Sequence, residues 1–187
     1  GNSLLDLVVF GRAAGKHIEK MLSDGIEQRV ASDADVEVAL ARLNRLNESK
    51  GGEDVVSLRS ELQEVMQNHF GVFRKGDFMK TGIERLQGIG ERIKNIFLED
   101  KSKTFNTARI EALELENLFE VALATAIAAE ARNESRGAHA RDDFRERDDE
   151  NWLCHSIYDP VNGGGRKRGV NFAPKSVDTF EPKERTY

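Results

Sequence analysis

The stretch L-F-E-V-A-L-A-T-A-I-A-A-E-A at residues 118–131 decides the fold. It is rich in alanine, short of charge and free of proline, and this composition favours an α-helix. We expect one helix over residues 106–134. A helix with so few charged residues tends to sit centrally, with close neighbours on several sides.

Two further amphipathic helices are expected before this stretch, over residues 54–69 and 77–99. Their apolar residues recur at the spacing of one helix face. These residues are Val55, Leu58, Leu62, Val65, Met66 and His69 in one helix, and Met79, Ile83, Leu86, Ile89, Ile93 and Phe97 in the other. Three long helices with short connections predict an up-down bundle.

Residues 1–23 and 34–47 predict two more helices, which would pack on the bundle or bridge to something else. Leu4 to Phe10 is apolar except for Asp6, so we expect the first helix to be buried on most sides. Gly11 and Gly15 stand four residues apart on one face. Because glycine weakens a helix, this pair predicts a close packing partner.

The C-terminal tail has a different composition. Residues 1–134 contain no proline, whereas all three prolines lie in the last 28 residues. Residues 152–158 and 168–173 alternate weakly and could form two strands around a turn at 162–165. The fold class predicted is mainly α: an up-down bundle with packing helices and an extended tail that could form a β-hairpin. The expected segments are 1–24, 25–134 and 135–187.

Composition excludes several classes of function. The net charge of -5 argues against a nucleic-acid binder. No apolar run approaches 18 residues, so the chain itself is not expected to span a membrane. A single cysteine, Cys154, excludes an internal disulfide and fits a reducing compartment. No histidine or cysteine pair has metal-ligand spacing, so no metal site is expected.

Four local patterns each allow an ordinary structural explanation and a functional one. Gly88-Ile-Gly90 resembles part of a dinucleotide fingerprint but lies in a helix, where small residues at a contact are the better explanation. Gly163–Gly165 precedes Arg166, Lys167 and Arg168, which favours a solvated turn over an anion site. The ionisable residues at 134–143 favour surface ion pairs over a catalytic cluster, although Gly137 allows a turn toward another domain. The N-terminus of the first helix fits an anion site and ordinary capping equally well.

Several longer motifs occur in order along the chain. They are G-N-S-L-L-D-L-V-V-F-G-R-A-A-G at the start, A-L-E-L-E-N-L-F-E-V-A at 112–122, E-S-R-G-A-H-A-R-D-D-F at 134–144, R-D-D-E-N-W-L-C-H-S-I-Y at 147–158 and the terminal P-K-E-R-T-Y. Together they resemble the flavoprotein subunit of succinate dehydrogenase, in the succinate dehydrogenase and fumarate reductase family. The close of the chain resembles the bacterial branch.

The resemblance implies a larger subunit that binds FAD covalently and oxidises succinate to fumarate. The family's H-G-A-N-R-L-G motif would end about where Gly1 begins, so the N-terminus looks cut. The resemblance therefore implies no catalytic residue in this chain, no bound FAD and no activity by itself. Ser3 and Leu4 match a pair that contacts the flavin in the family.

The partners that the resemblance implies are the chain's own FAD-binding domain and an iron–sulfur subunit. Contact with the membrane would be indirect, through anchor subunits on the cytoplasmic side of the bacterial inner membrane, and no nucleic acid is expected. Arg136, His139 and Arg141 are candidates for interdomain or subunit contacts. Two alternatives stay open: a fumarate reductase flavoprotein fragment, and a free-standing helical interaction module.

Overall fold

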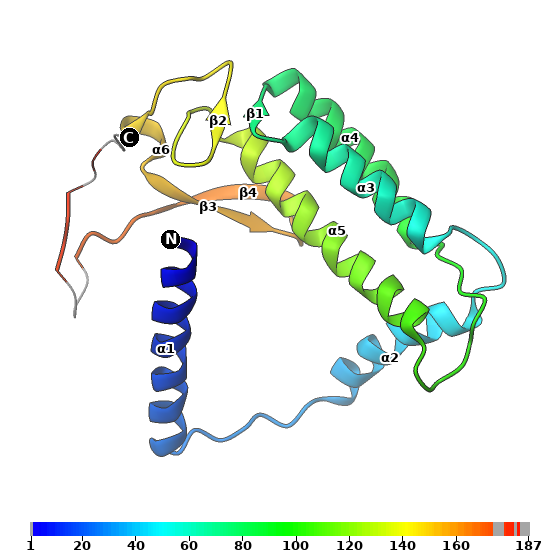
Figure 1. Cartoon of the computed structure of the whole chain (residues 1–187). Coiled ribbons are helices and arrows are strands. Elements are labelled where there is room, and N and C mark those ends of the chain that lie inside the picture. Colours follow the sequence, from blue (N-terminus) through cyan, green and yellow to red (C-terminus); the bar gives the residue numbers. More distant parts are fainter. Residues whose placement is uncertain (1, 174–177, 182, 184–187) are drawn as a thin grey trace. The chain divides into compact units, whose positions relative to one another are not determined.

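The computed structural model describes residues 2–173, 178–181 and 183. The chain divides into two compact units, residues 1–43 and 44–187, which are described separately (Figure 1). Pro174, Pro182 and residues 184–187 of the terminal motif lie outside the described residues. The division into segments 1–24, 25–134 and 135–187 stays a prediction.

The first unit holds α1 (Asn2–Ser23) and most of α2 (Asp33–Glu48). Helix α1 has the predicted span, but the prediction that it is buried is wrong: Leu4, Val8 and Phe10 are about two-thirds exposed or more. The described residues of this unit supply no second layer to cover an apolar helix. The close neighbour predicted at Gly11 and Gly15 is likewise not found, since a Cβ at either position would meet nothing within 4 Å.

The second unit is built on α3 (Val55–Phe70), α4 (Gly76–Ile93) and α5 (Thr107–Ala131). These helices run alternately up and down beside one another, which confirms the predicted bundle (Figure 1). The apolar stripes predicted for α3 and α4 face the core. The largest fully buried apolar side chains are Leu46, Leu58, Leu62, Val65, Met79, Leu86, Ile89, Ile96 and Leu115.

The helix ends follow from local hydrogen bonds. Asp54 caps α3 by accepting from Ser57 N at 2.8 Å, and Asn106 caps α5 by accepting from Arg109 N at 2.8 Å. Helix α4 ends at Ile93, short of the predicted end at 99. Beyond Ile93 the chain instead pairs with Glu53, whose backbone bonds to Asn95 and Phe97 at 2.9 and 3.0 Å.

The Gly88-Ile-Gly90 pattern lies within α4, as predicted, but only one of its glycines is at a contact. A Cβ at Gly90 would lie 2.4 Å from Cζ of Phe119, so the Phe119 ring packs directly on the α4 backbone. A Cβ at Gly88 would meet nothing within 4 Å.

Two small sheets complete the second unit. The short strands β1 (Phe73–Arg74) and β2 (Ala140–Arg141) pair in parallel. A short helix, α6 (Asp149–Trp152), then leads into the antiparallel hairpin β3 (Cys154–Asp159) and β4 (Gly164–Gly169), which lies against α5 (Figure 1). None of the helices among the described residues is long and apolar enough to cross a bilayer.

The predicted hairpin forms, but the range predicted for its second strand is wrong. Asp159 accepts hydrogen bonds from Val161 N at 3.0 Å and Asn162 Nδ2 at 2.6 Å, and Gly163 has a φ of 62°. The turn therefore ends at Gly163, and the two glycines that follow it belong to β4. Arg166, Lys167 and Arg168 consequently lie within β4 and not in a solvated turn.

Candidate functional site

The C-terminal end of α5 is closed by the side chain of Arg141, which is 3% exposed. Its Nη1 donates to the carbonyl oxygens of Ala129, Glu130 and Arg132 at 3.4, 2.9 and 3.0 Å. The last carbonyls of a helix have no partner within the helix, and the negative end of the helix dipole attracts a cation. Arg141 satisfies both requirements with one guanidinium group.

Asp143 links this helix end to the start of α4. Its carboxylate accepts from Nε and Nη2 of Arg141 at 2.7 and 2.9 Å, and from Gly76 N at 2.9 Å. The guanidinium of Arg141 is the main reason why the pKa of Asp143 lies far below its ordinary value. A Cβ at Gly76 would lie 3.0 Å from Oδ2 of Asp143, so the backbone of α4 approaches the ion pair closely.

His139 lies between two arginines and is held as a neutral imidazole. Its Nδ1 is 2.8 Å from Nη1 of Arg74, which can only donate, so Nδ1 accepts. The Nε2–H group then donates to the carbonyl oxygen of Arg132 at 3.1 Å. Burial lowers the pKa of His139, and the positive charges of Arg74, Arg141 and Arg132 lower it further.

Glu134 is fully buried and ionised. Its oxygens accept from Arg132 Nη1 at 2.5 Å, from Arg136 Nε and Nη2 at 2.8 and 3.0 Å, and from Asp148 N at 2.9 Å. Burial alone raises the pKa of a carboxyl group. The hydrogen bonds from Arg136, Asp148 and Arg132 outweigh that effect and leave the pKa of Glu134 below its ordinary value.

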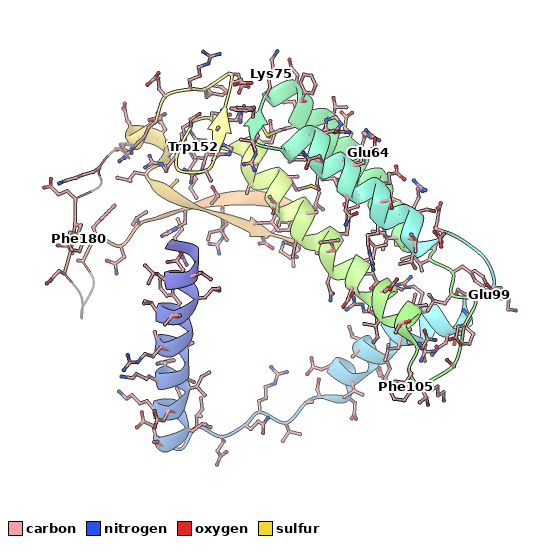
Figure 2. All side chains as sticks on the ribbon, viewed as in Figure 1. Glu64, Lys75, Glu99, Phe105, Trp152 and Phe180 are labelled. Carbon is pink, nitrogen blue, oxygen red and sulfur yellow. The ribbon has the colours of Figure 1, made fainter. Side chains whose placement is uncertain are left out.

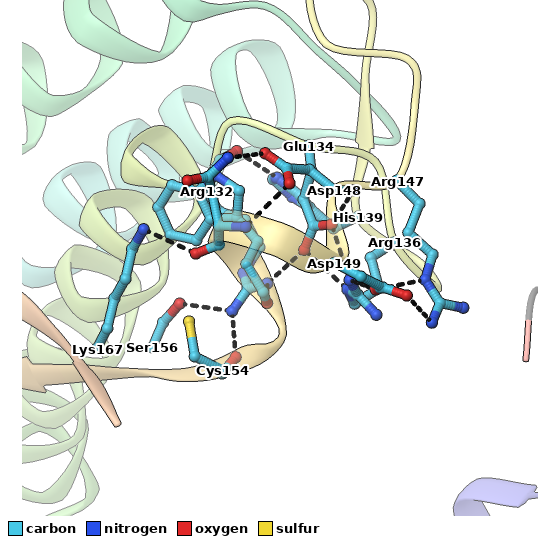
Figure 3. Close-up of polar contacts among 12 residues, drawn as sticks. Arg132, Glu134, Arg136, His139, Arg147, Asp148, Asp149, Cys154, Ser156 and Lys167 are labelled. Carbon is cyan, nitrogen blue, oxygen red and sulfur yellow. Dashed lines mark hydrogen bonds and ion pairs between the residues drawn. The ribbon is translucent and has the colours of Figure 1, made fainter. Parts of the chain in front are cut away.

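The network continues to the surface through Arg136. Its Nη2 donates to Oδ1 of Asp149 at 2.5 Å, and Arg147 donates to both oxygens of Asp149 at 2.7 and 2.6 Å (Figure 3). The hydrogen bonds from Arg147 and Arg136 lower the pKa of Asp149 to about 2. Arg136 therefore connects a buried carboxylate to an exposed one.

Arg132 fastens the hairpin to the end of α5. Its guanidinium donates to the carbonyl oxygens of Trp152 and Cys154 at 2.9 and 2.6 Å and to Oγ of Ser156 at 3.1 Å (Figure 3). It also lies 5.1 Å from the centre of the Trp152 ring, while Nζ of Lys167 lies 3.4 Å from the same ring centre. Such cation–π contacts add to the hydrogen bonds.

We call this set the arginine junction: Arg74, Arg132, Glu134, Arg136, His139, Arg141, Asp143 and Asp149. It corrects the prediction of surface ion pairs, because Glu134 is fully buried and Arg141 is 3% exposed. The sequence pattern did not reveal the contribution of Arg74 or Arg132. The one sequence feature that indicates this junction is the density of ionisable residues after a helix rich in alanine.

The junction is built to hold chain segments together. Each of its arginines and carboxylates is engaged in hydrogen bonds, and no hydroxyl or thiol nucleophile is paired with His139, whose two ring nitrogens are occupied. Among the described residues, no group of three or more histidine, cysteine, aspartate or glutamate residues could hold a metal ion. The arrangement supports a structural clamp.

The structure brings together three of the residues singled out from the sequence. Arg136, His139 and Arg141 all belong to the arginine junction. Ser3 and Leu4 lie in the first unit, at the start of α1. Leu4 is 71% exposed, and the side chain of Ser3 lies outside the described residues.

Comparisons with known proteins agree on one family. Residues 59–187 match the family model described as fumarate reductase flavoprotein C-term. The chain is 50% identical, over 98% of its length, to the succinate dehydrogenase flavoprotein subunit of Coxiella burnetii. It is 34% identical, over 100% of its length, to the fumarate reductase flavoprotein subunit of Haemophilus influenzae. In each case it covers 31% of the relative.

A solved structure of E. coli quinol fumarate reductase matches the fold with a TM-score of 0.78 and 33% identity. That match covers 96% of this chain and 31% of the solved chain. The chain thus spans about a third of the length of the proteins it resembles. It belongs to the succinate dehydrogenase and fumarate reductase flavoprotein family and corresponds to the C-terminal region of its members.

Proposed function

We propose that this chain is the C-terminal part of a flavoprotein subunit that oxidises succinate to fumarate. The observation that carries the proposal is the 50% identity to a succinate dehydrogenase flavoprotein subunit over 98% of the chain. The identity to the fumarate reductase subunit over a similar length is 34%. This difference favours succinate oxidation over the reverse reaction, which is the second candidate.

In this proposal, the three-helix unit is a rigid support for a flavin-binding part that precedes it. The catalytic residues and most of the flavin site would lie in that preceding part. The arginine junction supports this role, because it ties the ends of α4 and α5 to the segment that carries the hairpin. Arg136, His139 and Arg141 would then affect interdomain or subunit contacts by holding the surface that makes them.

Helix α1 would carry the chain's contribution to the flavin site, through Ser3 and Leu4. The residues present fit such a role. The first turn of α1 contains no acidic residue, and Leu4 is exposed at the same end. The N-terminal amides of a helix favour electron-rich oxygens such as those of a flavin ring. FAD in the whole subunit would accept the hydride from succinate.

The exposed apolar residues of α1 support the same assignment. Leu5, Val8, Val9 and Phe10 are each more than half exposed, and a patch of this kind usually marks an interface. We propose that the flavin-binding part covers them. The further partners would be an iron–sulfur subunit and, through it, a quinone-reducing membrane anchor. The subunit would then be peripheral, on the cytoplasmic side of the inner membrane.

The test is an assay of the whole gene product. The reading frame that contains codons 1–187 should be expressed in full, purified and examined for flavin absorbance and for succinate-dependent dye reduction. Fumarate reduction with a low-potential donor should be measured on the same sample. Faster succinate oxidation supports the proposal, whereas faster fumarate reduction supports the second candidate. A reading frame without a flavin-binding part would leave only a free-standing interaction module.

A further inference from the structure

A hollow lies within the second unit, between the C-terminal half of α5 and the hairpin. The residues that line it include four apolar side chains and two basic ones: Ile127, Ala131, Trp152, Ile157, Arg166 and Lys167. The volume of the hollow is about 80 Å³, whereas one water molecule needs about 10–15 Å³ by the same measure. It is therefore large enough for a group of several non-hydrogen atoms, such as an aromatic ring.

A glycine near the start of β4 keeps the hollow open. Gly165 pairs with Tyr158 in the hairpin and lines the hollow without a side chain that would fill it. A Cβ at Gly165 would meet nothing closer than the carbonyl oxygen of Ile157 at 3.8 Å, so close packing does not require a glycine there. Glycine inside a strand weakens the strand and often marks a position that a ligand approaches closely.

Lys167 places a positive charge beside the apolar wall. Its Nζ donates to the carbonyl oxygen of Asn151 at 3.0 Å (Figure 3). The same Nζ lies 3.4 Å from the ring centre of Trp152, which lies where α6 passes into the hairpin (Figure 2). An ammonium group has three donors, so Lys167 can bind an anion in addition to these two contacts.

Two carboxylates act on these cations, but other groups hold both of them. The pKa of Asp148 is lowered mainly by the hydrogen bonds that cap α6 and less by the charge of Lys167. The pKa of Asp159 is lowered mainly by the hydrogen bonds of the hairpin turn and less by the charge of Arg166. In the part of the chain that the structure describes, neither basic residue forms an ion pair and no acidic residue lines the hollow.

The two ends of the hollow differ in charge. Lys167 pairs with Ser156 near the base of the hairpin, whereas Tyr158 lines the hollow nearer the turn. Burial raises the pKa of Tyr158, and the negative charges of Glu120 and Asp159 raise it further. An anion is therefore repelled at the Tyr158 end of the hollow and attracted at the Lys167 end.

We propose that this hollow, here called the hairpin pocket, binds a small aromatic carboxylate. The aromatic ring lies between Ile127 of α5 and Ile157 of β3, and the carboxylate bonds to Lys167 and Arg166. A concave, mostly apolar site with a few polar groups that fix orientation is typical for small molecules. Binding in the hairpin pocket does not depend on the reaction proposed above.

The fluorescence of Trp152 tests the proposal, because Trp152 is the only tryptophan in the chain. Phenylacetate, added to the 187-residue chain, should change this fluorescence with a saturable curve and a dissociation constant on the order of 1 mM. Acetate lacks the ring and phenylacetamide lacks the charge, so each should bind at least about tenfold more weakly. A curve that does not saturate, or equal curves for phenylacetate and either control compound, would overturn the proposal.

A matched pair of variants separates the hairpin pocket from the general positive charge of β4. Arg166 lines the pocket, whereas Arg168 does not, and both arginines are exposed. Neither Arg166→Gln nor Arg168→Gln should therefore change the melting temperature. Arg166→Gln should weaken phenylacetate binding by about fivefold or more, because it removes a charge-assisted hydrogen bond, and Arg168→Gln should leave it unchanged. Equal effects of the two substitutions on binding would contradict the proposal.

The full-length subunit provides the final check. After labelling with 15N-tryptophan, the indole N–H signal of Trp152, identified with a Trp152→Phe variant, should shift when phenylacetate is added. An unchanged signal would mean that another part of the subunit fills the hairpin pocket, and it would overturn the proposal. Because neither readout uses turnover, a subunit that binds phenylacetate but does not oxidise succinate would contradict only the proposed function.

Discussion

Arg141 and Asp143 form a bidentate ion pair that joins the end of one helix to the beginning of another. The guanidinium bonds to the last carbonyls of α5, and the carboxylate bonds to the backbone N–H of Gly76 at the start of α4. Each charge lies at the helix end whose dipole favours it. One pair of side chains thereby connects two antiparallel helices and the segment that follows them.

Arg141→Ala should lower the free energy of unfolding of the chain by about 3 kcal/mol, because it removes a buried guanidinium and leaves the partly exposed carboxylate of Asp143 without its partner. It also leaves the final carbonyls of α5 without donors. Arg166→Ala is the matched control, since Arg166 is an exposed arginine on β4, and its effect should stay within about 0.5 kcal/mol. Urea unfolding followed by circular dichroism measures both. Equal effects of the two substitutions would show that the Arg141–Asp143 pair does not contribute to stability.

Alanine substitutions at Gly88 and Gly90 of α4 should change the stability of the chain in opposite directions. Gly90→Ala places a Cβ 2.4 Å from the Phe119 ring and should destabilise the chain by about 1–3 kcal/mol through overpacking. Gly88→Ala meets nothing within 4 Å and should stabilise it by up to about 1 kcal/mol through helix propensity. The two melting temperatures should therefore move in opposite directions. A shift of the same sign in both would refute the packing described for Phe119.

The neutral His139 should make stability depend on pH between about 7 and 5. Its pKa in the folded chain lies below the ordinary value of about 6.5, so its contribution to stability is complete above that value. The contribution is lost as the pH falls below about 6.5, because the unfolded chain then binds a proton that the folded chain resists. The depressed carboxyl pKa values act at lower pH and do not interfere.

His139→Gln should flatten this pH dependence, whereas His17→Gln, an exposed position on α1, should not. The free energy of unfolding should be measured at half-unit steps from pH 7 to pH 5. If the wild-type chain and the His139→Gln variant lose stability in parallel over this range, the assignment of a neutral His139 is wrong.

Arg132→Ala should release the hairpin without loosening the bundle. The substitution removes the donors to Trp152, Cys154 and Ser156. It also removes one donor to Glu134, which keeps its hydrogen bonds from Arg136 and Asp148 N. Backbone amides of β3 and β4 should exchange faster with deuterium, while amides in the middle of α3 and α4 keep their protection. Lys167→Ala removes the contact with Trp152 and one hydrogen bond, so its effect on the hairpin should be smaller. A uniform increase in exchange across α3, α4 and the hairpin would mean that Arg132 stabilises the whole unit.

The helices of the bundle could be predicted from the sequence, because the residue patterns that specify them are local. The stripes of α3 and α4 and the caps at Asp54 and Asn106 depend on residues a few positions apart. The early end of α4 was not predictable, since it depends on pairing with Glu53, a residue of another segment. The strand range of β4 depends on the side chain of Asp159, which closes the turn earlier than the run of glycines indicates.

The arginine junction could be predicted from the sequence only in part. The resemblance directed attention to Arg136, His139 and Arg141, and the structure joins them. Arg74, which completes the set, comes from a distant position after α3, and Asp143 bonds to the backbone N–H of Gly76 at the start of α4. The density of charged residues at 134–143 favoured a solvated surface. The sequence does not reveal that these residues pack on the C-terminal end of α5. The exposure of α1 could not be predicted either. Apolar composition indicates that a helix is buried, but it does not tell whether the residues that cover the helix belong to the same chain.

The most direct test of the central claim is the rate of succinate-dependent dye reduction by the full-length product of the reading frame that contains this chain. The account predicts a flavin-containing subunit that oxidises succinate, while the 187-residue chain alone shows no such activity. A full-length product that binds flavin but does not oxidise succinate, or activity in the 187-residue chain alone, would contradict the account.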